Sequence, residues 1–365
     1  MNRRKFLMSA GIAAVGAALP RTSQLFAVEK PPEWRTFELT TRVEIADAAG
    51  ATRVWLPETL LRETAYQRSL GQRFAAPGGT VELVKSEIDG LGIVSASFPA
   101  GVKPVVVLTS QVSTRNIAVD LAHPVHHHHQ ADSAELQHFL RSTSLMPLDG
   151  LVKTTSDKIT AGATNDVEKA RAIYEWIVDN TFRDPKVRGC GTGDVRWLLQ
   201  SGDLGGKCAD LNALYVALAR AAGIPARDAY GIRVVKSELG YKSLGASSEK
   251  VSKAQHCRAE VYLKKFGWVP VDPADVRKVV LEEPPGNRPL TDEMVVAARK
   301  RLFGSWEMNW VAFNFAHDVK LPGSEGAPVP FFMYPQAEVA GKRRDSLDPD
   351  GFHYEITAHE VMASV

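Results

Sequence analysis

The stretch Gly206-Lys207-Cys208-Ala209-Asp210-Leu211, followed by Gly223-Ile224-Pro225-Ala226-Arg227, decides the fold of this chain. Between the two segments, apolar residues recur at the spacing of one helical face: Leu211, Leu214, Tyr215 and Leu218. Gly223 and Pro225 then form a stop signal, because glycine tolerates a left-handed backbone and proline cannot continue a helix. The pattern predicts a helix that begins at Cys208. Unpaired N–H groups at a helix N-terminus favour a thiolate, so Cys208 is a candidate nucleophile.

A nucleophilic cysteine needs a base and a group that orients the base. His256 begins the segment 256–263 and Asp272 follows the segment 268–271, and both segments have the composition of short strands joined by a tight turn. A turn centred on Lys264 would place His256 opposite Asp272. A four-residue loop at 264–267 would pair Asp272 with Ala259, about 10 Å along the strand from His256. The sequence permits both registers.

These blocks resemble the transglutaminase-like superfamily of cysteine enzymes, which have a papain-like fold. The resemblance is carried by four motifs: Cys-x-Asp-x-x-x-Leu at 208–214, Gly-Ile-Pro-Ala-Arg at 223–227, a histidine followed by Glu-Val-Tyr at 256–262, and Gly-Trp-Val-Pro-Val-Asp-Pro at 267–273. It covers residues 165–275, including an amphipathic helix predicted over Asp166 to Asn180, and is thinner on either side. Cys257 departs from the pattern, since the family often has an aromatic or small residue after the histidine.

The resemblance implies a catalytic triad, with Cys208 as nucleophile, His256 as general base and acid, and Asp272 as the residue that holds the imidazole. Family members often place a polar or indole oxyanion donor in the approach to the nucleophile, which makes Trp197 and Gln200 candidates here. A packed tryptophan and a surface glutamine would explain those two residues equally well. The backbone N–H of Cys208 is a further candidate donor, because a helix N-terminus leaves it free.

The expected fold class is α+β, with a papain-like transglutaminase core in which the helix carrying Cys208 packs on an antiparallel sheet. Residues 28–120 have the alternating apolar pattern and Gly/Pro turns of a β-rich N-terminal domain. We expect a linker over 121–160 and a transglutaminase-like catalytic domain with C-terminal strands over 161–365. A chain of 365 residues suits two domains.

Residues 1–27 have the features of a twin-arginine-type signal peptide. Asn2-Arg3-Arg4-Lys5-Phe6-Leu7-Met8 precedes an apolar run from Ala10 to Leu19, which is too short for a transmembrane helix. The alternatives are a retained N-terminal anchor and a disordered tail. Beyond this segment the sequence contains no run long and apolar enough to span a bilayer, so no stable membrane span is expected after cleavage. We therefore expect a periplasmic or otherwise exported protein.

Charge and motifs exclude several classes of function. The formal charge is +2, and removal of residues 1–27 takes away four cations and no acid, which leaves −2. A near-neutral protein has no electrostatic case for binding nucleic acid. The sequence contains no phosphate-binding glycine loop and no EF-hand calcium loop, so no cofactor is expected.

The histidine run and the spare cysteines are weaker signals. The four adjacent histidines His126 to His129 cannot all face one ion and have no Cys or carboxylate cluster nearby, so a solvated loop is favoured over a metal site. Three cysteines are too few for a disulfide scaffold. Cys190 and Cys257 could pair in an oxidising compartment or remain as two free buried thiols.

Together these features predict an exported cysteine enzyme, a cysteine protease or amidase or a transglutaminase-type acyltransferase. Its substrate would be a peptide, protein or cell-wall amide, attacked by Cys208 to give a thioester acyl-enzyme. Water would complete a hydrolysis and an amine a transamidation, and the residues do not choose between them. Two alternatives stay open: a catalytically inactive transglutaminase-like binding or scaffold protein, and an acyltransferase of the same fold that uses a thioester donor.

Overall fold

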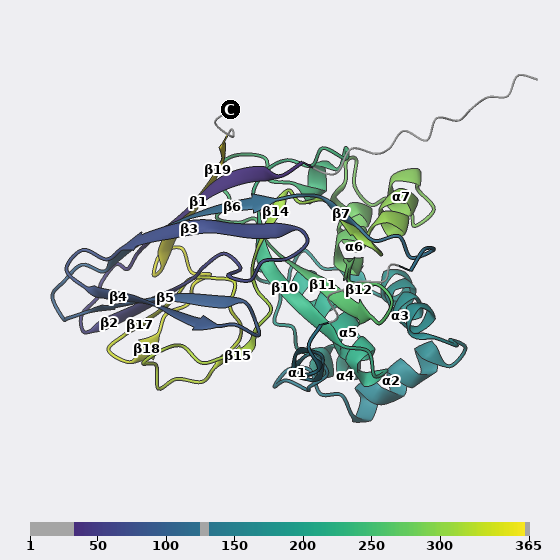
Figure 1. The fold of residues 1–365 in the computed structure, drawn as a ribbon. Coiled ribbons are helices and arrows are strands. Elements are labelled where there is room, and N and C mark those ends of the chain that lie inside the picture. The colour runs from purple at the N-terminus through teal and green to yellow at the C-terminus, as the bar shows by residue number, and fades with distance from the viewer. Residues whose placement is uncertain (1–32, 125–130, 362–365) are drawn as a thin grey trace, which may run out of the picture. The chain divides into compact units, whose positions relative to one another are not determined.

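The computed structural model describes residues 33–124 and 131–361 (Figure 1). The predicted signal peptide at 1–27 and the His126 to His129 run lie outside the described residues. Within the described ranges, no helix has both the length and the apolar character needed to cross a membrane.

The N-terminal half of the chain contributes most of two antiparallel sheets, with strand orders β19-β1-β6-β3 and β18-β17-β2-β5-β4. Apolar side chains from both sheets, including Val43, Val54, Val94 and Val106, pack in one buried cluster, so the sheets face each other as a sandwich. The strands of these sheets are β1 (Arg35–Glu44), β2 (Thr52–Pro57), β3 (Gln67–Ala75), β4 (Thr80–Ser86), β5 (Leu91–Phe98), β6 (Val105–Thr114), β17 (Gln336–Val339), β18 (Lys342–Arg343) and β19 (His353–Val361).

The C-terminal strands return to these N-terminal sheets. β19 pairs with β1 along its whole length, and β17 pairs with β2. This pairing covers strand edges that would otherwise expose unpaired backbone groups. The predicted linker over 121–160 also contains structure, namely α1 (Ser133–His138) and α2 (Gly150–Thr160), and Ser156 of α2 donates a hydrogen bond of 2.8 Å to the carbonyl of Leu218. The sheets therefore do not follow the predicted boundaries at residues 120 and 160.

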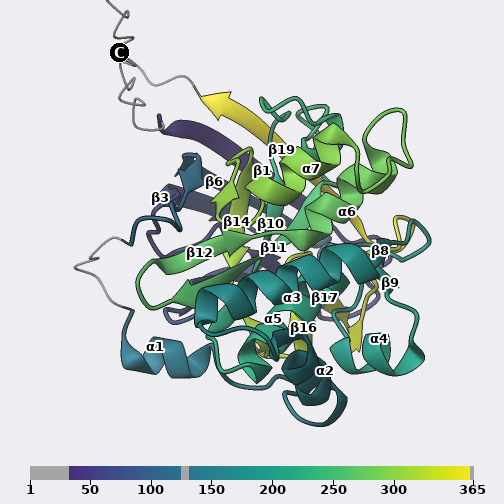
Figure 2. The same ribbon diagram turned by 90° about the vertical axis from the view of Figure 1, so that its right-hand side faces the viewer.

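A second unit of structure is built around α5 (Cys208–Ala221) and a sheet of order β12-β11-β10-β14. Figure 2 shows α3 (Asp166–Asn180) and α5 beside this sheet, and their apolar side chains share one core with those of β10–β12. The strands are β10 (Ala226–Arg233), β11 (Gln255–Leu263), β12 (Gly267–Val271) and β14 (Trp310–Asn314). This arrangement confirms the predicted α+β fold, with the cysteine-bearing helix packed on an antiparallel sheet and a β-rich N-terminal region.

The helix that carries the cysteine forms as its sequence pattern predicts. All four residues of its apolar face are fully buried: Leu211, Leu214, Tyr215 and Leu218. The helix ends before Gly223, whose φ of 84° places it in the left-handed region that a side chain disfavours. Helix α3 begins after Asn165, whose side chain accepts the N–H of Glu168 as an N-cap.

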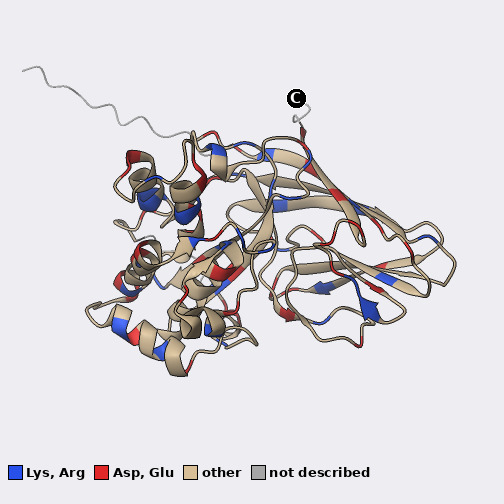
Figure 3. Cartoon of the chain, turned by 180° about the vertical axis from the view of Figure 1, so that it is seen from behind, with Lys and Arg blue, Asp and Glu red and all other residues tan. Residues whose placement is uncertain are grey.

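The remaining elements are short, and two of them, α6 and α7, add apolar side chains to the core of the second unit. β7 pairs with β13, β15 pairs with β16, and β8 pairs in parallel with β9. They are β7 (Ile117–Ala118), β8 (Phe182–Arg183), α4 (Val195–Ser201), β9 (Gly205–Gly206), the 3-10 turn η1 (Lys242–Leu244), α6 (Pro273–Glu282), α7 (Glu293–Arg301), β13 (Ser305–Trp306), β15 (His317–Val319) and β16 (Val329–Phe331). Cationic and anionic residues are interspersed along the helices and sheets (Figure 3).

Candidate active site

Cys208 is the first residue of α5 and is almost completely buried, with 4% of its surface exposed. The first hydrogen bond of the helix joins the N–H of Leu211 to the carbonyl of Lys207 at 3.0 Å. The backbone N–H of Cys208 lies before this bond, in the first turn of the helix. Asp210 closes the helix start, because its carboxylate accepts the N–H of Lys207 at 2.9 Å. The cysteine therefore lies at the N-terminal end of a buried helix, where the helix dipole favours a negative charge.

The same Asp210 carboxylate fixes the loop that approaches the cysteine. Its Oδ1 atom accepts the N–H groups of Thr192 at 2.9 Å and Gly193 at 3.0 Å. Gly191 passes so close that a Cβ atom there would lie 1.9 Å from the Asp210 Oδ2 atom, and its φ of 98° is also disfavoured for a side chain. The aspartate of the Cys-x-Asp motif thus has a positioning role that requires glycine beside it.

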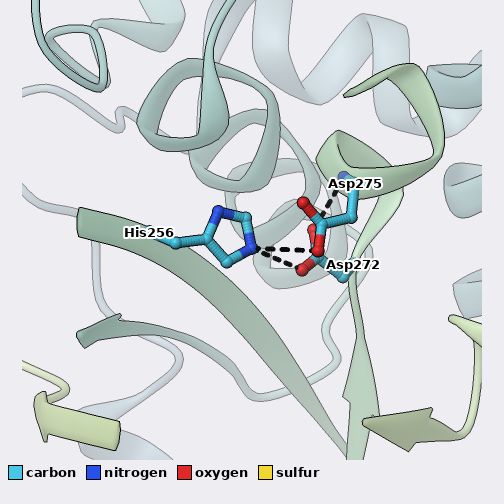
Figure 4. Close-up of side chains that lie close together, drawn as sticks. All are labelled: His256, Asp272 and Asp275. Atoms are coloured by element: carbon cyan, nitrogen blue, oxygen red, sulfur yellow. Dashed lines mark hydrogen bonds and ion pairs between the residues drawn. The ribbon is translucent and has the colours of Figure 1, made fainter. Parts of the chain in front are cut away.

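His256 and Asp272 meet, although by a route that differs from both predicted registers. The hairpin pairs Leu263 with Gly267 and Ala259 with Val271. This register differs by one residue from that of the predicted four-residue loop, in which Ala259 would pair with Asp272. Asp272 then leaves the strand as the N-cap of α6. From there its Oδ2 atom reaches the Nε2 atom of His256 at 2.8 Å (Figure 4).

The Asp272 carboxylate is fully buried and held on its other oxygen as well. Oδ1 accepts the N–H of Asp275 at 3.0 Å and the side-chain amide of Asn212 at 3.2 Å. Asn212 also donates to the carbonyl of Cys257 at 2.8 Å, which connects α5 to β11. The orientation of the carboxylate toward His256 is therefore fixed by two elements, α5 and α6.

Asp275 is a second carboxylate at the histidine that the sequence reasoning missed. Its Oδ2 atom lies 3.4 Å from His256 Nε2 (Figure 4). Arg233 holds the carboxylate through contacts of 2.6 and 2.8 Å. A detectable signal existed, because Asp275 follows Asp272 by three residues in a helix start. His256, Asp272 and Asp275 are also close enough together to be potential metal ligands. The charge of Arg233 on Asp275 opposes a cation at that position.

Opposing effects set the pKa of His256. Burial disfavours the imidazolium, as does the charge of Arg233, but Asp275 and Asp272 outweigh both and raise the pKa to about 9. The ring nitrogen Nδ1 points away from the two carboxylates (Figure 4). The imidazole is thus charged at neutral pH and anchored through Nε2, which leaves Nδ1 for another partner.

The pKa of Cys208 lies well below its ordinary value. Hydrogen bonds with the thiols of Cys190 and Cys257 are the main cause, and the hydrogen bond and charge of His256 add to them against the effect of burial. The pKa values of Cys190 and Cys257 are raised, the first chiefly by that contact with Cys208 and the second chiefly by burial. All three cysteines are free, so the Cys190–Cys257 disulfide considered from the sequence is not formed.

The lowered pKa predicts that Cys208 keeps more thiolate than a free cysteine as the pH falls. Alkylation of Cys208 by iodoacetamide should therefore slow much less between pH 8 and pH 6 than that of a free thiol with a pKa near 8.5, which slows by roughly 70-fold. Mass spectrometry would assign the label among the three cysteines. A rate at Cys208 that follows the free thiol would contradict the lowered pKa.

A cavity of about 690 Å³ is lined by both Cys208 and His256. Cys190 lines it as well. Trp197 and Gln200, the predicted oxyanion donors, lie on α4 and do not line this cavity. Trp197 is 58% exposed and Gln200 is exposed too. The structure thus brings His256 and Asp272 together beside the cavity and does not bring the α4 side chains to it.

The central part of the chain matches a known protein family. Residues 153–273 match the model of the transglutaminase-like superfamily. An uncharacterized protein of Haemophilus influenzae is 47% identical over 238 residues, a match that covers 63% of this chain and 64% of that protein. The chain therefore spans less than two thirds of this relative's length.

The fold is shared with a crystal structure from Cytophaga hutchinsonii that is provisionally described as a cysteine protease. The TM-score is 0.57 with 16% sequence identity, over 91% of this chain and 93% of that chain. At this identity the likeness concerns the fold alone. Residues 153–273 are thus the part of the chain that matches the transglutaminase-like superfamily.

Proposed function

We propose that this protein is a cysteine-dependent enzyme that acts on an amide or peptide bond. The observation that carries the proposal is the buried pair of His256 and Asp272, 2.8 Å apart, in which His256 lines the same cavity as Cys208. The lowered pKa of Cys208 and the raised pKa of His256 support a thiolate–imidazolium pair. The superfamily match of residues 153–273 supports the same reaction class.

In the first half-reaction, the Cys208 thiolate attacks the carbonyl carbon and forms a C–S bond. The oxyanion is placed near the N-terminus of α5, where the Cys208 N–H can donate to it. The His256 imidazolium gives its proton to the leaving nitrogen as the C–N bond breaks. The products are a free amine and a thioester on Cys208.

In the second half-reaction, water or an amine attacks the thioester carbonyl. Neutral His256 accepts the proton of the attacking group, and the C–S bond breaks to regenerate the thiolate. Water gives a carboxylic acid and an amine gives a new amide. Asp272 keeps the imidazole anchored through Nε2 and stabilises its charged form in both halves.

Trapping of the acyl-enzyme tests this proposal. The protein would be incubated with peptides and cell-wall fragments, with and without a fluorescent primary amine, and analysed by intact mass and by product. We expect a thioester adduct on Cys208, followed by free acid or by amine incorporation. Iodoacetamide labelling provides an independent check of nucleophile reactivity. A Cys208 that is inert to the reagent and forms no adduct would instead favour a transglutaminase-like binding protein.

We also propose export through the twin-arginine pathway, on the basis of Arg3 and Arg4 in the N-terminal segment. Replacing both with lysine should retain the precursor in the cytoplasm of a bacterial host that has this pathway, because the arginine pair is the part of the signal that is recognised. Fractionation and immunoblotting would measure the distribution, with Arg21→Lys as the matched control. Equal export of the double variant and the parent would show that the signal was misassigned.

A further inference from the structure

The cavity at Cys208 is lined by basic residues out of proportion to the chain as a whole. The sequence has nearly equal numbers of cations and anions, 44 and 42. No Asp or Glu lines the cavity, whereas besides Arg233 six cationic residues do: Arg183, Arg188, Lys207, Lys250, Lys253 and Lys278. In the view of Figure 3, by contrast, residues of both signs alternate along the helices and strands.

Part of this charge is compensated by acids outside the lining. Arg188 pairs with Asp345 at 2.6 Å, and Lys250 pairs with Glu355 at 3.0 Å. Arg183 and Lys278 share a single carboxylate, that of Glu282. At that corner two cations therefore face one anion.

The electrostatics of Lys278 reflect the excess of cations. Burial lowers its pKa, and the charges of Arg183 and Arg233 lower it further, against the attraction of Glu282. A carboxylate brought into this part of the cavity would relieve that repulsion. The cavity wall thus favours an anion beyond the acids that the chain itself supplies.

Two lysines of the lining make no ion pair within residues 33–124 and 131–361, namely Lys207 and Lys253. Lys207 directly precedes the nucleophile, and Lys253 lies three residues before His256. The two cations therefore come from the two segments that carry the reacting groups. A ligand placed for reaction would lie between segments that each supply an uncompensated positive charge.

We propose that the cavity binds a peptide segment with carboxylate groups close to the bond that reacts, and that Lys207 and Lys253 bind these carboxylates. This inference rests on the proposed function, because it names the substrate class of the same site. A volume of about 690 Å³ has the size of a site for several peptide residues. Tyr334, Phe352 and Tyr354 also line the cavity and provide apolar surface beside the charges.

Peptide binding to the Cys208→Ala variant tests the inference without turnover. The probes are fluorescent capped peptides of equal length, one rich in Glu and one with Gln at the same positions, measured by anisotropy at low salt. A unit charge pair about 4 Å apart in water is worth roughly fivefold in an equilibrium constant. The Glu peptide should therefore bind about tenfold or more tightly than the Gln peptide, and 0.5 M salt should reduce the difference.

The lysine variants supply the decisive comparison. Lys207→Gln with Lys253→Gln should remove most of the preference for the Glu peptide. Lys264→Gln with Lys265→Gln is the matched control, because these exposed lysines of the β11–β12 turn carry the same charge and do not line the cavity. Equal binding of the two peptides, or equal losses in the two double variants, would overturn the inference.

Further probes separate the sources of the carboxylate. A peptide with a free C-terminus and neutral side chains is compared with an amidated peptide that carries Glu side chains, and the tighter binder identifies the source. A DNA oligonucleotide that binds as tightly as the Glu peptide would contradict a peptide site. These measurements are independent of the reactivity of Cys208: an inert thiol would refute the proposed enzyme, and binding without charge preference would refute only the anionic substrate.

Discussion

Alanine in place of Cys208 should abolish turnover while the fold remains intact. Loss of a catalytic nucleophile costs on the order of a millionfold in rate, so only the small residual rate that substrate binding and the oxyanion site support should remain. The free energy of unfolding should fall by only about 1 kcal/mol, because the change removes one sulfur atom from a small side chain. Asp210 still accepts the N–H of Lys207 in this variant, so the start of α5 is retained. Product assays and chemical denaturation would measure the two effects.

The neighbouring thiols give matched controls for this variant. Cys190→Ala and Cys257→Ala also remove a buried sulfur, and the effect that these two thiols have on Cys208 is to lower its pKa. Each should retain turnover and shift its pH dependence toward higher pH. A loss of several kcal/mol in stability for Cys208→Ala, as found for core truncations, together with full inactivation by Cys190→Ala, would show that the nucleophile was misassigned.

The sequence was sufficient to predict the helix that begins at Cys208, because its signals are local. The apolar spacing from Leu211 to Leu218 specifies a buried face, and Gly223 specifies a left-handed residue at its end. Neither signal depends on the rest of the chain. The same holds for α3, whose start at Asn165 is a side-chain cap.

The sequence indicated that His256 and Asp272 could lie close together, but it did not give the geometry of their contact. Strand composition cannot set the register of a hairpin, and the loop of residues 264–266 lies between the two alternatives. The residue pair Asp272-Pro273 carried the missing information. An aspartate followed by proline is typical of a helix N-cap, and the cap turns the carboxylate back toward the histidine.

Features that depend on distant parts of the chain were beyond the sequence patterns. The pairing of β19 with β1 joins residues more than 300 positions apart, and no local motif specifies it. The interaction of Asp275 with Arg233 likewise depends on α6 packing near the end of β10. Trp197 shows a limit of arguing from family resemblance. The resemblance suggested Trp197 as an oxyanion donor, but its side chain is exposed on α4.

Asn in place of Asp272 should lower turnover by about 10⁴-fold and preserve the fold. Asparagine is as good an N-cap as aspartate, so its side chain can still accept the N–H of Asp275 and hold α6. Its amide can also donate to His256 Nε2, which keeps the proton on Nδ1 and leaves no acceptor there. The pKa of His256 should fall from about 9, because one of the two carboxylates that raise it is lost.

A titration of the imidazole by NMR and a product assay would measure these two changes. The sign of the pH effect follows from the raised pKa: the stability that the charged imidazole contributes is complete below pH 6.5 and is lost as the pH rises through about 9. In Asp272→Asn this loss should be smaller and should end at a lower pH, because the substitution lowers the pKa of His256 in the folded state only.

Asp292→Asn is the matched control for the same substitution. Asp292 caps α7 through the N–H of Met294 and accepts from Arg288, so it shares the structural duties of Asp272 without contact to a histidine. Its replacement should leave turnover and the His256 titration unchanged. If Asp272→Asn is silent while Asp275→Asn lowers both turnover and the pKa of His256, the orienting carboxylate is Asp275. That result would assign Asp275, one helical turn after Asp272, to the triad. Both carboxylates contact the same ring nitrogen of His256, at 2.8 and 3.4 Å from Nε2, so the experiment decides between them.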